Sequence, residues 1–200
     1  METKEAELEL SVIKKIMEDS RKAAYDSGMQ GIMWSVVIAV TLILNYVILI
    51  LKMGYQYLGI IWIIMIAIGS VAAIIINIRE KKKIRTKTFA GRVLIAVWSS
   101  IGISNAIFAF AAGVAHAFDP IYIIPLDSFV LGMGFYVTGT IQQMKFLKNL
   151  TLLWWAQGIV FLIYPSIHSL LSFSVLLIVS LLLPALENRS KWKMESQSAV

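Results

Sequence analysis

Residues 31–51 read GIMWSVVIAVTLILNYVILIL and decide the fold class of this chain. Asn45 is the only strongly polar side chain in the stretch. About 20 apolar residues in a helix cross the roughly 30 Å hydrocarbon core of a bilayer. Apolar residues occur on all sides of the stretch rather than along one stripe, which is typical of a helix embedded in lipid. We therefore predict a first transmembrane helix at 31–51.

Five further apolar stretches follow the first, and none alternates with the period of two that a membrane β-barrel requires. The sequence therefore predicts an all-α, polytopic membrane helix bundle with a transmembrane domain at 30–187 and a cytoplasmic tail at 188–200. The fifth stretch is short, with an alternative start a few residues before 150, and the fourth is the least uniform. The predicted spans are 31–51, 57–78, 91–112, 121–141, 150–164 and 167–186.

Composition excludes several classes of protein. Of the 200 residues, 58% are hydrophobic and only 15% are charged, whereas soluble domains are about 45–50% apolar. Such a chain is neither an ordinary soluble domain nor intrinsically disordered. It contains no cysteine, which excludes disulfides, thiol nucleophiles, thiolate zinc sites and iron–sulfur clusters.

The distribution of Lys and Arg predicts the orientation in the membrane. With six spans, 17 of the 18 basic residues fall on one side and Lys52 alone falls on the other. Basic residues are retained on the cytoplasmic side. We therefore expect a protein of the bacterial inner membrane with both termini in the cytoplasm. The net charge of +6 is then explained by basic residues that set the membrane topology, and it does not indicate binding to nucleic acid.

Two segments outside the spans have their own patterns. Residues 1–29 contain a predicted amphipathic cytoplasmic helix, with apolar residues such as Leu10, Ile13 and Met17 at helical spacing before Gly28. It is expected to lie on the lipid surface, and the alternative is a docking helix for a soluble partner or a second copy. The basic loop at 79–92 is expected to contact anionic lipid head groups.

Several short motifs occur along the chain. They are Ile16-Met17-Glu18-Asp19-Ser20-Arg21-Lys22, Gly31-Ile32-Met33-Trp34, the basic loop leading into Trp98, Gly132-Met133-Gly134-Phe135-Tyr136-Val137-Thr138-Gly139, and Leu183-Pro184 followed by Ala185. Together they resemble a family of bacterial six-span membrane proteins with no assigned activity. The resemblance implies the six-span architecture and contributes no catalytic residue. Members of that family commonly have Gly where this chain has Ala185, at a shared turn.

Asp127 is the acidic residue placed most clearly inside a predicted span, just after Pro125. Polar residues inside membranes are costly and often functional, so one interpretation is a proton or cation site. The other, which we favour from sequence, is that Pro125 starts the helix and Asp127 caps it near the outer surface.

His116, His168, Asp119 and Asp127 all map to the outer face. Two His with a carboxylate form a workable zinc ligand set, but the spacing of a metal motif is missing, so no metal or cofactor is predicted. Phosphate loops, nucleophile elbows and catalytic acidic pairs are missing as well. Other polar residues inside the spans are interpreted as packing residues that hydrogen-bond between helices, including Asn45, Asn105, Gln157 and several serines.

These observations predict a non-enzymatic membrane protein that acts as a sensor, regulator or assembly partner, with a second copy of the chain in a homo-oligomer or another membrane protein as the candidate partner. The alternative is a small transporter or channel for an ion or small solute, which would need connected polar groups near the midplane. A third hypothesis is an intramembrane enzyme that uses His116, His168 and Asp127.

Overall fold

The computed structural model describes residues 7, 9–14, 28–54, 56–80 and 89–198. Within that part of the chain every regular element is helical, and six helices are long and apolar enough to cross a membrane. The prediction of an all-α membrane bundle is confirmed. The helices are α2 (Met29–Ile50), α3 (Gln56–Glu80), α4 (Phe89–Gly113), α5 (Ile123–Ile141), α6 (Lys145–Ile163) and α7 (Ser169–Ser198), with a 3₁₀ turn η1 (Pro120–Tyr122) before α5.

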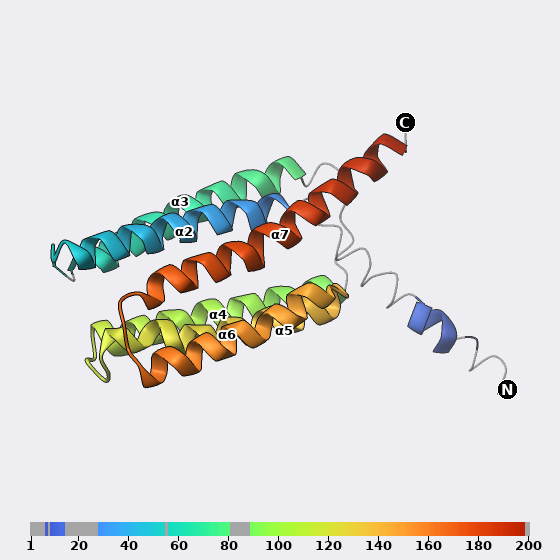
Figure 1. The fold of residues 1–200 in the computed structure, drawn as a ribbon. Coiled ribbons are helices and arrows are strands. Elements are labelled where there is room, and N and C mark those ends of the chain that lie inside the picture. Colours follow the sequence, from blue (N-terminus) through green and yellow to red (C-terminus); the bar gives the residue numbers. More distant parts are fainter. Residues whose placement is uncertain (1–6, 8, 15–27, 55, 81–88, 199–200) are drawn as a thin grey trace.

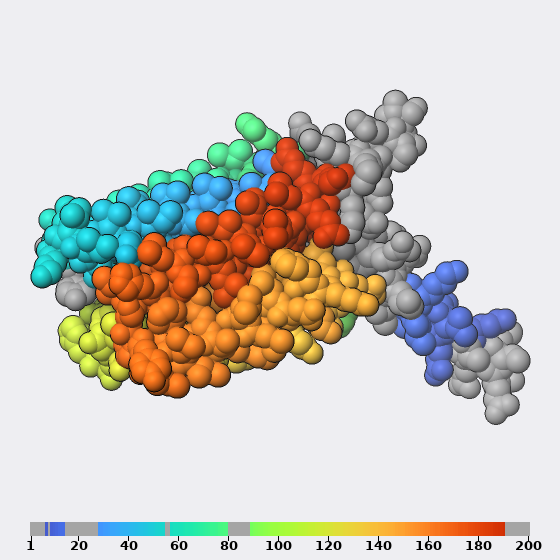
Figure 2. All heavy atoms as spheres, in the orientation of Figure 1, coloured from blue at the N-terminus to red at the C-terminus, as the bar shows by residue number. Residues whose placement is uncertain are grey.

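Two groups of helices lie side by side (Figure 1). Helices α2 and α3 pack as a hairpin, and α4, α5 and α6 form the second group, in which α5 and α6 are the most closely packed pair. Helix α7 packs along α2 and also contacts α5 and α6. The space-filling view shows α7 lying across the face between α2 and α6 (Figure 2). Helix α7 therefore makes the main contacts between the two groups.

Glycines set the close approaches between helices. Gly28 precedes α2 with a φ of 69°, and a Cβ there would overlap the carbonyl oxygen of Ala185 in α7. Gly69 in α3 leaves room for the indole ring of Trp34 in α2. A Cβ at Gly139 in α5 would lie 2.9 Å from the backbone nitrogen of Lys148 in α6. Lipid provides no hydrophobic force that drives helices together, so membrane helices associate through close packing, which small residues such as glycine allow.

Two helix boundaries differ from the sequence prediction. Helix α6 begins at Lys145 rather than at residue 150, and the Lys148 ammonium in its first turn lies 5.3 Å from the ring centroid of Tyr136 in α5. Helix α7 continues through Pro184 to Ser198, so Leu183-Pro184 lies inside the helix, and the predicted tail from 188 is helical as far as Ser198. Proline removes one helical hydrogen bond, but packing maintains the remaining helix.

Two predicted segments fall largely outside the described residues. Of the amphipathic helix at 1–29, residues 9–14 are described and helical, and Gly28 and Met29 belong to the start of α2. Of the basic loop at 79–92, Arg79 lies in the last turn of α3 and Arg92 lies near the start of α4. Its central residues, 81–88, lie outside the described part of the chain.

Candidate functional site

The start of α5 shows which acidic residue caps a helix. Asp119 precedes η1, and its carboxylate accepts a 2.9 Å hydrogen bond from the backbone N–H of Ile121. Helix α5 follows directly from η1 and begins at Ile123, so Pro125 lies in its first turn, where a missing N–H costs nothing. Asp127 is the fifth residue of α5 and is helical. The interpretation of Asp127 as a helix cap is therefore wrong, because Asp127 lies inside α5, whose N-cap is Tyr122, and the side chain that caps the preceding turn η1 is Asp119.

The carboxyl of Asp127 is instead buried between helices, with only 9% of the residue exposed. It faces Asn105 of α4. When the Asn105 amide is turned so that its nitrogen faces Asp127, the nitrogen can donate hydrogen bonds to two oxygens. It then lies 3.1 Å from Asp127 Oδ1 and 3.1 Å from the carbonyl oxygen of Ile101. Among the described residues, no Lys, Arg or His forms an ion pair with this carboxyl. The donor that the turned Asn105 amide offers to this carboxyl is neutral.

A second polar contact joins the same turn of α5 to α6. The amide Nε2 of Gln157 donates a 3.0 Å hydrogen bond to Ser128 Oγ, and the Ser128 hydroxyl donates 2.8 Å to the carbonyl oxygen of Ile124. Ser128 is fully buried. Asn105, Asp127, Ser128 and Gln157 therefore form a cluster that spans α4, α5 and α6, which we call the Asp127 cluster.

A row of aromatic rings fills the bundle on the Lys145 side of the Asp127 cluster. Trp98 meets Phe135 edge to face at 5.2 Å between ring centroids, Phe135 stacks on Trp154 at 5.5 Å, and Trp154 meets Phe173 edge to face at 5.0 Å. The four rings come from α4, α5, α6 and α7. Phe135 and Trp154 are fully buried, so the row is a packed layer across the interior.

The other predicted site residues do not join the Asp127 cluster. His116 is exposed with a φ of 51° in the connection after α4. His168 is exposed and its Nδ1 lies 3.1 Å from the hydroxyl of Tyr46 in α2. Asp119 is occupied as the cap of η1. In the described part of the chain, no three His, Cys, Asp or Glu residues lie close enough to hold a metal ion.

Sequence reasoning named every member of the Asp127 cluster except Ser128, but it interpreted Asn105 and Gln157 as separate packing residues. The missing information was which helices are neighbours. Helical periodicity gives the face on which a residue lies and leaves the facing helix undetermined. The serine directly after Asp127 and a lone glutamine within an apolar span were the available signals.

The chain matches no protein-family model, no curated protein and no solved structure. Function is therefore argued from the geometry above.

Proposed function

We propose that this is a non-enzymatic integral membrane protein that works as a sensor, regulator or assembly partner. The observation that carries the proposal is the closed aromatic row across α4, α5, α6 and α7. A transporter or channel needs a polar route that passes from one side to the other. Here packed rings occupy the interior between the Asp127 cluster and the opposite end of the bundle.

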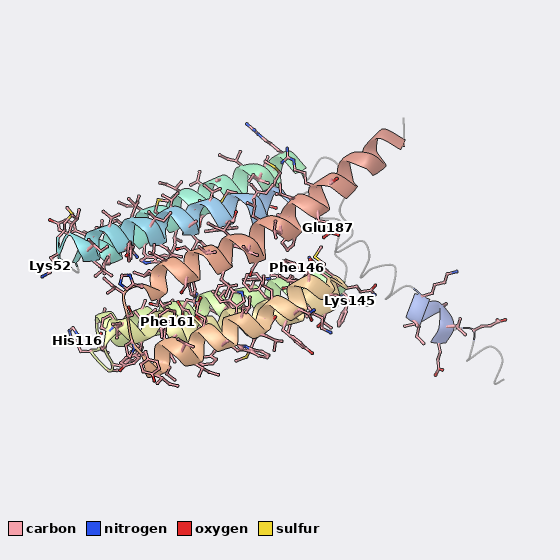
Figure 3. All side chains as sticks on the ribbon, in the orientation of Figure 1. Lys52, His116, Lys145, Phe146, Phe161 and Glu187 are labelled. Atoms are coloured by element: carbon pink, nitrogen blue, oxygen red, sulfur yellow. The ribbon has the colours of Figure 1, made fainter. Side chains whose placement is uncertain are left out.

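The placement of charge supports an orientation in a bacterial inner membrane in which both termini lie in the cytoplasm. Lys52 and His116 lie at one end of the bundle, whereas Lys145 and Glu187 lie at the other (Figure 3). The remaining described basic residues of the spans and their flanks occur at the Lys145 end of their helices, because α3 ends at Arg79 and α4 begins near Arg92. That end is the cytoplasmic one under the positive-inside rule. Its basic residues, including the loop at 79–92, are suited to anionic lipid head groups.

A second copy of this chain is the partner that we propose for the outer face of α4. Helix α4 packs mainly on α5 and leaves its other side exposed. Small residues on that side recur at alternating intervals of three and four, the spacing of one helix face, and such faces let two membrane helices approach closely. They are Ser99, Gly102, Ala106, Ala109 and Gly113.

Single cysteines test this partner with no background, because the chain contains no native cysteine. Cysteine at Ala106 should form a disulfide-linked dimer in oxidised native membranes. Cysteine at Leu152, which is equally exposed but lies on α6, serves as the matched control and should remain monomeric. Equal cross-linking at both positions would show random collision, and none at Ala106 would remove α4 as the contact.

The Asp127 cluster favours a second candidate function, a small transporter that is coupled to an ion. Its side chains connect three helices inside the spans, which is the connected polarity that a transporter requires. The test is flux of protons or sodium ions into proteoliposomes that contain the purified protein. The sensor or regulator proposal expects the same flux as in empty liposomes, and flux above that level would favour the transporter.

A further inference from the structure

We infer that Asp127 and Asn105 form a binding site for one positive charge, a proton or a sodium ion, that is supplied from the Lys52 side of the membrane. The inference goes beyond the proposed role as a sensor, regulator or assembly partner, which requires no ligand. Either that role or the transporter alternative would use such a site.

The charge balance around Asp127 is the first support. A carboxylate that leaves water without a countercharge is strongly disfavoured, and one neutral hydrogen bond does not compensate for the lost hydration. The Asn105 amide is neutral. A bound proton or cation is what makes the group electrically neutral.

Charged groups on the helices that pack against α5 lie elsewhere. Arg92 lies near the start of α4, Lys145 and Lys148 lie in the first turn of α6, and Glu187 and Arg189 lie in the last part of α7. All of these belong to the Lys145 end of the bundle. At the Asp127 end, the titratable groups in the connections and helix ends next to α5 are His116, Asp119, Tyr122, Tyr164 and His168, and those of the α2–α3 hairpin are Tyr46, Lys52 and Tyr57.

The three polar groups around the carboxyl suit a positive ligand. With the Asn105 amide turned so that its nitrogen faces the carboxyl, that nitrogen lies 3.1 Å from Asp127 Oδ1 and 3.1 Å from the Ile101 carbonyl oxygen. An asparagine amide can present its N–H to a carboxyl oxygen or, turned over, its oxygen to a cation. Proton binding forms one O–H bond on the carboxylate and breaks one O–H bond of a hydronium ion from the outer water, which leaves as water. Sodium binding would use the carboxylate, amide and carbonyl oxygens.

Depth determines the side from which the ligand comes. Asp127 lies four residues after the start of α5, a rise of about 6 Å along the helix. The aromatic row, with Phe135 two turns further along α5, fills the interior toward the opposite end. The short approach is therefore from the end that carries Lys52 and His116 (Figure 3).

Thermal unfolding of the purified chain in lipid nanodiscs tests the site. A ligand that binds the folded state raises Tm by roughly 3–6 °C for each tenfold rise in concentration above its Kd. Wild type should respond either to proton concentration at fixed sodium or to sodium at fixed pH, with choline chloride keeping the ionic strength constant. Asp127→Asn should remove the response, and Asp119→Asn, the matched control on an exposed cap, should retain it.

Each result has one meaning. A response to pH alone identifies the proton, and a response to sodium alone identifies the cation. A wild type with neither response, or a response that persists unchanged in Asp127→Asn, overturns the site. Neither outcome depends on cross-linking through α4, so the failure of this inference and that of the proposed function are distinguishable.

An infrared measurement covers the case in which Asp127→Asn does not fold. Difference spectra of wild type between low and high ligand concentration should show a changed carboxyl band. In Asn105→Ala, which lacks the amide, the band should shift in frequency and its midpoint should move by at least tenfold in ligand concentration, since a hydrogen bond to a charged group is that strong. A carboxyl spectrum that is independent of the ligand, or one that is identical in Asn105→Ala, would contradict the inference.

Discussion

The indole Nε1 of Trp154 donates a 2.8 Å hydrogen bond to Ser180 Oγ, and both residues are fully buried. This contact joins α6 to α7 at the centre of the aromatic row. The same indole ring packs between Phe135 and Phe173. Trp154 of α6 therefore combines apolar contacts with two other helices, α5 and α7, and one directed polar contact, which fixes how α7 is rotated against the second group.

Trp154→Phe should destabilise the protein by about 1–3 kcal/mol, because it leaves the Ser180 hydroxyl without its donor and removes ring volume. Thermal or denaturant unfolding in mild detergent measures the loss. Ser180→Ala removes the same hydrogen bond from the other side, so the double variant should cost less than the sum of the two single changes. Strict additivity would show that the hydrogen bond contributes nothing measurable.

Gly28→Ala should be strongly destabilising, by about 2 kcal/mol or more, because an L side chain disfavours a φ of 69° and its Cβ would overlap Ala185. Gly59→Ala in α3 is the matched control, since nothing lies within 4 Å of a Cβ added there. The comparison uses Tm and the yield of folded protein. Equal tolerance at the two positions would argue against the close contact between α2 and α7.

Asp119→Ala should cost about 0.5–2 kcal/mol, since the Ile121 N–H loses the cap that it now has. Asp119→Asn should be nearly neutral, because asparagine caps about as well as aspartate. The order of Tm values, wild type close to Asn and both above Ala, checks the assignment. If the Tm of Asp119→Asn falls as far as that of Asp119→Ala, the negative charge rather than the hydrogen bond stabilises this position.

Reporter fusions test the orientation. A fusion at residue 85 and one after the C-terminal residue should both report the cytoplasm, and a fusion at Lys52 should report the opposite side. The expectation rests on the placement of Lys52 away from the other 17 basic residues. An external signal at residue 85 would reverse the assignment and would move the Asp127 cluster to the cytoplasmic side.

The number and approximate position of the helices were predictable because hydropathy over about 20 residues is a local property. The role of Asp127 was not predictable, because a cap and a buried carboxyl share the sequence context Pro-Leu-Asp and differ only in what the neighbouring helices supply. The start of α6 was missed because Lys145 and Lys148 interrupt the apolar run. The continuation of α7 through Pro184 depends on packing against α2, which hydropathy does not report.

Helix α7 has a consequence for how the molecule is built. Synthesis delivers the α2–α3 hairpin first and the α4–α6 group next, and the helix that holds them together leaves the ribosome after both. Until then, the indole N–H of Trp154 lacks the acceptor that Ser180 of α7 provides. The two earlier groups of helices therefore lack most of the contacts that join them until α7 is inserted, and the final assembly step is the packing of α7 against both.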